Sequence, residues 1–217
     1  MGKNAFFIIV LFLSLSSCNK NEVVYSCDND VNDWVYENLD NIASMTRSEW
    51  KSLDDEYKIP VFRAFTQEQR VLFWNEKIND IISGYDWNVE EHKHIVELLN
   101  FINNNVDIFD FSTEYSDEQI ERIEVFSYKW IENALNELGW DLPLIKSIVA
   151  SGDDIGSNSE TGNVELRNPK CNCNTESWVE WCITTHCDGG NCLESNHGCA
   201  FLLVGECNGS CYRFKIK

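Results

Sequence analysis

The stretch from residue 28 to residue 170 contains no cysteine, although the chain has ten. Eight of the ten fall within the last 47 residues, a segment too short to be held together by apolar burial alone. We therefore expect covalent cross-links in this C-terminal segment and an ordinary apolar core in the cysteine-free part. The eight cysteines are Cys171, Cys173, Cys182, Cys187, Cys192, Cys199, Cys207 and Cys211.

No apolar run reaches the ~20 residues that a membrane-spanning helix needs. The run at residues 5–13 follows a basic start and precedes small residues, as in a secretory signal peptide over residues 1–17. Residues 15–18 read Leu-Ser-Ser-Cys, which matches the lipobox of bacterial lipoproteins. The sequence thus predicts a lipid anchor on Cys18, a polar leash over residues 18–29 and a place in the bacterial cell envelope. The alternative is an ordinary signal peptide with an incidental cysteine.

Basic residues are scarce. Lys and Arg number 17 against 36 Asp and Glu, which gives a net charge of −19, nearly all of it outside the C-terminal segment. A chain this acidic repels nucleic acid and anionic lipid, so we expect neither as a partner of its surface. The simpler interpretation of the charge is solubility on a crowded surface.

Residues 30–150 carry repeated patterns that begin and end helices. Ser or Thr followed three residues later by Glu or Gln forms a capping box, and apolar residues at helical spacing follow each such start. Five or six helices in about 120 residues predict an acidic all-α helical bundle domain. The predicted starts are Thr46, Thr66, Ser116 and, more weakly, Asn88, and the predicted ends are Gly84 and Gly139.

The same region lacks the motifs that mark common enzymes, namely a Gly-rich phosphate loop, a serine nucleophile elbow and HExxH. His92 and His94 are two residues apart and therefore lie on different helix faces, whereas a helical metal pair needs a spacing of four. Glu90 and His94 have that spacing, but the sequence offers no third ligand. We expect no catalytic site, no metal and no cofactor, and we interpret the six tryptophans of this region as core residues.

Residues 151–170 begin with a run rich in Gly, Ser and Asn and nearly devoid of apolar side chains, which predicts a flexible linker. The module of residues 171–217 has no C-x-x-C pair, so four disulfides are favoured over zinc or redox chemistry. Eight cysteines allow 105 pairings, among which the sequence does not choose. Cys27 is the odd cysteine, either a thiol or a bridge that would make a dimer.

The tail also carries β signals. Residues 200–204 read as a strand, and Asn208-Gly209 reads as a hairpin turn. A three-residue loop there would set Cys207 opposite Cys211, so this pair could close the hairpin. The expected fold is therefore an all-α helical bundle domain followed by a small disulfide-rich module that contains a β-hairpin.

The cysteine pattern of residues 171–211, including His-Gly-Cys at residues 197–199 and Cys-Asn-Gly-Ser at residues 207–210, resembles the bacteriocin fulvocin C, a small secreted peptide with eight cysteines. Exported bacterial proteins with such a tail behind a helical region are known as bacteriocin fulvocin C-related proteins. The chain departs from the pattern at Ala200, where another Gly is expected, and in its last two cysteines, which flank Asn-Gly. The resemblance implies membrane-directed killing by the tail.

We thus expect a lipid-anchored, bacteriocin-like antagonism protein whose tail is the effector, with release by cleavage in residues 151–170 as one route. The alternative is a displayed binding module for a glycan, a protein or an envelope component, and a third interpretation is an inert structural lipoprotein. For both active interpretations, the candidate recognition surface consists of tail aromatic side chains, because such residues dominate recognition surfaces. They are Trp178, Trp181 and Phe201.

Overall fold

The computed structural model describes residues 23–156, 173–175, 177–179, 181–182, 186–189 and 195–212. The predicted signal peptide, the predicted lipidation site Cys18, Cys171, Cys192 and most of the predicted linker lie outside the described residues.

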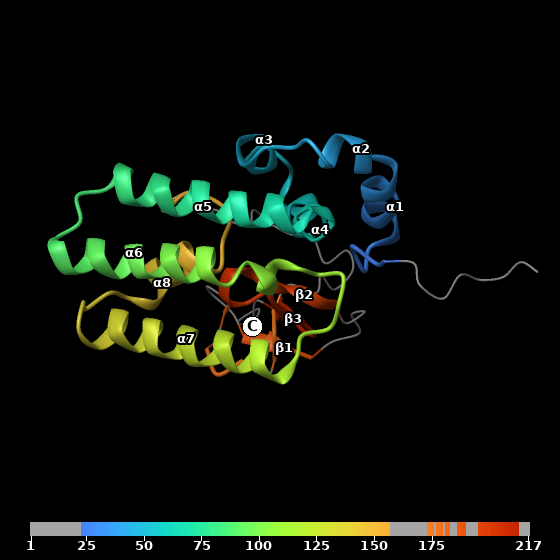
Figure 1. Cartoon of the computed structure of the whole chain (residues 1–217). Coiled ribbons are helices and arrows are strands. Elements are labelled where there is room, and N and C mark those ends of the chain that lie inside the picture. The colour runs from blue at the N-terminus through green and yellow to red at the C-terminus, as the bar shows by residue number, and fades with distance from the viewer. Residues whose placement is uncertain are drawn as a thin grey trace, which may run out of the picture.

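The described chain up to residue 150 is helical, which confirms the predicted all-α region. Its elements are α1 (Asn29–Glu37), α2 (Leu39–Ile42), α3 (Arg47–Lys51), α4 (Asp55–Ala64), α5 (Gln67–Gly84), α6 (Val89–Asn104), the 3₁₀-helix η1 (Val106–Phe109), α7 (Asp117–Asn136) and α8 (Leu142–Val149). Figure 1 shows the long helices α5, α6 and α7 following one another side by side, with α1–α4 gathered at one end. None of the described helices is long and apolar enough to cross a membrane.

Capping boxes begin four of the helices, at the predicted positions. In each, the cap side chain accepts a hydrogen bond from the backbone N–H three residues on, and the Glu or Gln there bonds back to the cap. These bonds satisfy N–H groups that the first helical turn leaves unpaired. The predicted ends are also confirmed, because α5 ends at Gly84 and Gly139 follows α7 with a φ of +68°. The four caps are Thr46, Thr66, Asn88 and Ser116.

Helix α4 was not predicted. Asp55 and Glu56 form its first turn, where negative charge interacts favourably with the helix dipole. Pro60 lies inside the helix and removes one backbone hydrogen bond. Burial of Pro60, Val61 and Phe62 against the core offsets that cost.

One apolar core runs through the helices. Its largest fully buried side chains include three tryptophans, a fourth tryptophan is buried nearby, and two more pack partly buried against the cluster. The interpretation of the six tryptophans as core residues is therefore confirmed. The buried ones are Trp50, Trp74, Trp130 and Trp140, and the partly buried ones are Trp34 and Trp87.

Short strands in the C-terminal region form two separate two-stranded sheets. Strand β1 (His186–Asp188) pairs antiparallel with β4 (Ser210–Tyr212), and β2 (Ser195–Cys199) pairs antiparallel with β3 (Gly205–Cys207). The pair β2–β3 is a β-hairpin, which confirms the predicted presence of one in a disulfide-linked module.

Two disulfides can be traced between described cysteines. Cys199–Cys207 joins β2 to β3, and Cys173–Cys187 joins the segment before β1 to β1 itself. Cys182 is disulfide-bonded as well. The predicted pairing of Cys207 with Cys211 is wrong, because Cys207 is bonded to Cys199.

The chain does not fold back at Asn208-Gly209 in the way the hairpin signal predicts. Gly209 forms a bridge with Cys173, and the following strand β4 pairs with β1. The turn residues therefore carry the chain from one small sheet to the other, and β3 and β4 are not partners.

Residues 200–204 form the connection between β2 and β3, not the predicted strand. The connection contains the 3₁₀-helix η2 (Phe201–Leu203), with positive φ angles at Ala200, Leu202 and Leu203. Each such φ costs about 1–2 kcal/mol for a residue with a Cβ, whereas full burial of a large apolar side chain contributes about 1.5–3 kcal/mol. The burial therefore outweighs the strain. We call the four buried residues of this connection the apolar loop: Phe201, Leu202, Leu203 and Val204.

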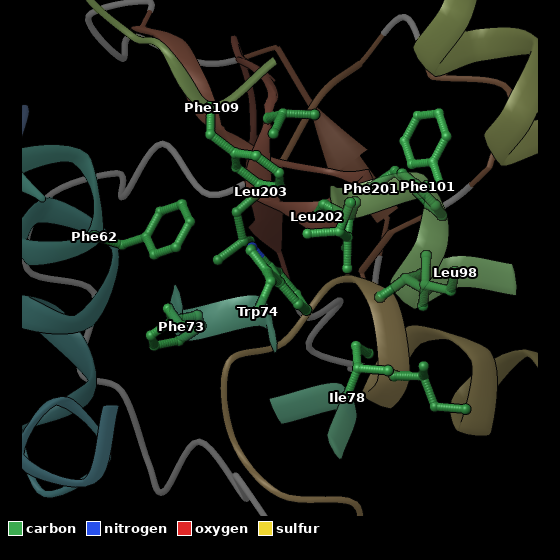
Figure 2. Packing of buried hydrophobic residues seen from close by; sticks show 14 of the residues in the cluster. Phe62, Phe73, Trp74, Ile78, Leu98, Phe101, Phe109, Phe201, Leu202 and Leu203 are labelled. Carbon is green, nitrogen blue, oxygen red and sulfur yellow. The ribbon is translucent and has the colours of Figure 1, made fainter. Parts of the chain in front are cut away.

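The apolar loop belongs to the core of the helical region. Its side chains join the same hydrophobic cluster as those of α4–α8. Figure 2 shows Leu202 and Leu203 in this cluster with Trp74 and Leu98. The C-terminal region is thus stabilised by burial in a core that it shares with the helices, in addition to its disulfides.

Candidate functional site

The structure separates the three predicted recognition residues. The Trp178 side chain is 49% exposed, whereas Trp181 and Phe201 are 9% and 3% exposed. The indole N–H of Trp181 donates to Ser177 Oγ at 2.6 Å, which satisfies its polar atom. Trp181 and Phe201 therefore cannot form an exposed surface, and the prediction is wrong for both because they fill the core instead.

Phe201 shows what these residues do. Its ring lies 6.4 Å from that of Phe101, 6.1 Å from that of Phe126 and 6.4 Å from that of Trp130, in edge-on arrangements. Such ring contacts add to the free energy of apolar burial. The side chain joins the tail to α6 and α7.

Trp178 has a partner that the sequence did not reveal. Its ring centroid lies 5.0 Å from that of Tyr128, which α7 presents with 52% exposure. We call these two residues the exposed aromatic pair. Val125, 44% exposed, precedes Tyr128 by three residues and so lies on the same face of α7. The pair therefore extends an apolar surface across the joint between helical and C-terminal regions.

A hollow of about 330 Å³ lies beside this surface, between α6 and α7. Phe101 and Phe126 stack in its lining with ring centroids 3.8 Å apart and planes 7° apart. Arg122 is fixed by a hydrogen bond to Asn105 Oδ1 at 3.2 Å and by an ion pair with Asp107. The remaining lining residues are Glu121, Val125 and Lys129.

The lining of the hollow combines apolar side chains with charged groups of both signs. The side chains that line the hollow are aromatic, aliphatic, amide, carboxylate and basic, and none of them is a cysteine, serine or histidine nucleophile. Val125 belongs both to the hollow and to the face of Tyr128. An apolar surface next to a shallow, mixed-charge hollow suits a ligand with apolar and polar groups.

A second cluster holds the start of the predicted linker. The guanidinium of Arg47 donates to Gly152 O at 3.0 and 3.2 Å and pairs with Asp154 at 2.7 Å. Lys51 also pairs with Asp154, and Lys58 pairs with Asp153 at 2.9 Å. We call this arrangement the cationic clasp. Residues 151–155 are therefore held on the helices, and the expectation of a flexible linker from residue 151 is wrong for them.

Lys77 completes the clasp from α5. It is fully buried, and its ammonium donates to Ser147 O at 2.6 Å and to Ser151 O, with the Trp74 ring centroid 5.2 Å away. Burial, and then the positive charge of Arg47, lower the pKa of Lys77 well below its ordinary 10.5. The group anchors the end of α8 to α5.

The histidines considered as metal ligands are not placed for that role. His94 is buried and stacks on Trp130 with ring centroids 4.3 Å apart, while His92 on the neighbouring face is exposed. Burial lowers the pKa of His94 to about 4. The position of His94 in the core is that of a packed aromatic side chain.

Among the described residues, one group of cysteine sulfurs has metal-like proximity, with all sulfurs within 4.8 Å of one another. Cys173 and Cys187 are bonded to each other, and Cys182 is also in a disulfide. Disulfide sulfurs are not thiolate ligands, so this group is a close packing of cross-links.

Cys27 packs, partly buried, against the Cys199–Cys207 disulfide. A dimer through Cys27 stays a prediction.

Sequence reasoning missed Tyr128 and Val125. The signal was present, because both fall outside the apolar face of the helix that follows Ser116 and are nevertheless apolar or aromatic. The contact of Tyr128 with Trp178 spans 50 residues of sequence and could not be read from spacing.

Comparisons of the chain with protein-family models, with curated proteins and with solved structures found no match.

Proposed function

We propose that the chain is a lipid-anchored binding protein of the bacterial envelope that recognises another protein through the exposed aromatic pair. The single observation behind this proposal is the contact of Trp178 with Tyr128, two large aromatic side chains that are each about half exposed. Anchoring through Cys18 and a place in the cell envelope are parts of the same proposal, supported by the lipobox at residues 15–18.

A protein partner is favoured by the composition of the surface. Tyr, Trp and Arg are enriched where protein interfaces bind most strongly, in well-packed patches surrounded by polar groups. Here Trp178 and Tyr128 are flanked by Val125 and by the hollow that contains Arg122. The charged residues around the hollow are of both signs, which suits a polar rim.

The structural elements that carry the exposed aromatic pair also favour binding. Tyr128 lies on the 20-residue helix α7, and Trp178 lies next to buried Val179. The segments that carry the two rings pack on the shared core through Trp130 and Val179, so little conformational entropy of the backbone is lost when a partner packs against the rings.

The test compares the mature chain with variants at the surface. Trp178→Ala and Tyr128→Ala are each expected to weaken binding to envelope proteins at least tenfold, as for residues at the centre of an interface. Leu72→Ala is the matched control, because Leu72 is 57% exposed on α5, away from the pair. Binding is measured by immobilising the chain and titrating solubilised envelope proteins and, separately, purified envelope glycans.

Saturable binding of a protein that both aromatic variants lose and Leu72→Ala keeps supports the proposal. Binding of glycan alone replaces the protein partner by a sugar ligand. Binding that all three variants retain rejects the surface.

Bacteriocin-like antagonism is a second proposal, supported by the resemblance of residues 171–211 to fulvocin C. The burial of Trp181 and Phe201 against the helices favours a tail that acts while attached, because a released tail would expose both side chains. Purified full-length chain applied to a panel of bacterial strains tests it, with growth inhibition as the expected result. Inactivity of the oxidised chain on every strain counts against it.

A further inference from the structure

His197 is a buried histidine of the β2–β3 hairpin that packs against side chains of the helical region. It is 6% exposed, and its imidazole stacks on Phe111 with ring centroids 4.1 Å apart and planes 9° apart. The ring of Tyr115 meets it edge-on at 4.7 Å. The guanidinium of Arg70 lies 3.7 Å from the centroid of Phe111. Phe111 thus contacts both the guanidinium of Arg70 and the imidazole of His197.

The hairpin lies very close to α4 at the same point. Arg63 Nε donates to His197 O at 2.8 Å, and Gly198, with a φ of +110°, leaves no room for a side chain, since a Cβ would lie 2.6 Å from Arg63 Nε. Docking of the hairpin therefore depends on the geometry of a few residues around His197.

The charged groups that face His197 are mostly positive. They are Arg63 from α4, Arg70 from α5 and Asp110 from the segment after η1, and the titratable hydroxyl of Tyr115 adds no charge at neutral pH. Both guanidinium groups bond to backbone carbonyls, Arg70 to Phe109 O and Arg63 to Tyr25 O. Asp110 accepts hydrogen bonds from Ser112. A proton on His197 would therefore add a third positive charge with one nearby carboxylate.

We infer that the β2–β3 hairpin is an acid-sensitive latch, which leaves its seat between α4, α5 and the segment after η1 when His197 is protonated. The Cys199–Cys207 disulfide keeps the hairpin closed on itself, so the hairpin moves as one unit. Its departure uncovers the apolar loop and the matching surface of the helices. The inference concerns the internal docking of the tail and does not depend on the proposed partner.

The size of the effect follows from linkage. Burial, followed by the charges of Arg70 and Arg63, lowers the pKa of His197 from 6.5 to about 4 in the docked state. The undocked imidazole regains its ordinary pKa, so protons favour undocking once the pH falls below about 6.5, until about 4. Between pH 7 and pH 5 the docking equilibrium weakens about twentyfold.

Hydrogen exchange on the disulfide-intact mature chain tests this inference. Exchange rates are corrected for the intrinsic effect of pH, and protection in β2 and β3 is compared with protection in α1, a helix that contains no histidine. We expect the hairpin to lose about twentyfold in protection from pH 7 to pH 5 while α1 loses markedly less. His197→Phe, which keeps a ring on Phe111 but cannot bind a proton, is expected to abolish the difference.

His94→Phe is the matched control, because His94 is also a buried, stacked histidine with a pKa of about 4 but lies in α6 on Trp130. It should leave the acid sensitivity of the hairpin in place. The inference is overturned if the wild-type hairpin and α1 lose protection in parallel, a comparison that needs no variant. It is also overturned if a folded His197→Phe protein keeps the twentyfold loss.

Discussion

The indole of Trp50 occupies the space in which a side chain at residue 152 would stand. A Cβ built on Gly152 would overlap that ring and would lie 2.5 Å from Cζ of Phe73, which packs edge-on against Trp50. The backbone of the cationic clasp can approach the core this closely because residue 152 is a glycine. The contact links the chain that leaves α8 directly to α3 and α5.

Gly152→Ala is therefore expected to destabilise the protein by about 1–3 kcal/mol, as overpacking of a filled core does. Gly84→Ala is the control, since a Cβ there meets nothing within 4 Å at the end of α5. In the control, the free energy of unfolding should stay unchanged or rise by up to about 1 kcal/mol. Denaturant unfolding of both variants measures the two free energies, and equal stability of the two variants would contradict the overlap.

We expect the buried Lys77 to make the stability of the fold depend on pH in the alkaline range. Because its pKa in the fold is well below its ordinary 10.5, the unfolded chain holds this proton at pH values where the fold does not. The folded state is therefore disfavoured below 10.5, and stability rises with pH from the folded pKa up to 10.5. Relative to Lys77→Met, the wild type should gain about 1.4 kcal/mol per pH unit in this window.

The measurement is chemical unfolding of the two proteins at a series of pH values from 7 to 10. Other groups, including the tyrosines, titrate in both proteins, so only the difference between the two curves is informative. Two parallel curves would show that Lys77 keeps its proton in the fold.

The shared core predicts that cutting the connector does not separate the two regions. With a specific protease site inserted in residues 157–170, the cleaved protein should elute as one species in size-exclusion chromatography under native conditions, because the apolar loop stays buried among α6–α8. Leu203→Asp places a charge in this core and should allow the fragments to separate. Separation of the cleaved wild-type fragments would mean that the disulfides hold the tail together without the shared core.

The anchor prediction concerns Cys18. Cys18→Ala should move the protein from the detergent phase to the aqueous phase in phase partitioning, because acyl chains contribute ~0.8 kcal/mol per buried methylene. Cys27→Ala retains the lipobox and is the control, which should stay in the detergent phase. A Cys18→Ala protein that still partitions into detergent would place the membrane affinity elsewhere in the chain.

The helical part could be predicted where local signals determine it. Capping boxes such as Thr66 with Gln69 satisfy their own first turn, so the sequence alone locates the start of α5. Helix α4 lacks a side-chain cap at Asp54 and contains Pro60, so its stability comes from tertiary burial that no local pattern reports. The prediction of a strand at residues 200–204 was wrong for the same reason, namely that tertiary burial decides the structure. An uninterrupted apolar run is compatible with any fully buried segment, whatever its secondary structure.

The candidate site could be predicted only in part. Trp178 was identified as an exposed aromatic residue of the tail, but Trp181 and Phe201 carry the same chemical signal and are buried. The difference arises from contacts with α6 and α7, which are distant in sequence. Tyr128 became part of the site only through its contact with Trp178.

The apolar loop follows α1–α8 in the sequence, so a ribosome synthesises it after these helices. Until the loop has been synthesised, Phe101, Phe126 and Trp130 lack the ring of Phe201 that packs against them in the folded protein. The core of the helical region can therefore be completed only after the apolar loop has been synthesised. Truncated chains that end before residue 200 would present this unfilled surface to other chains and to chaperones.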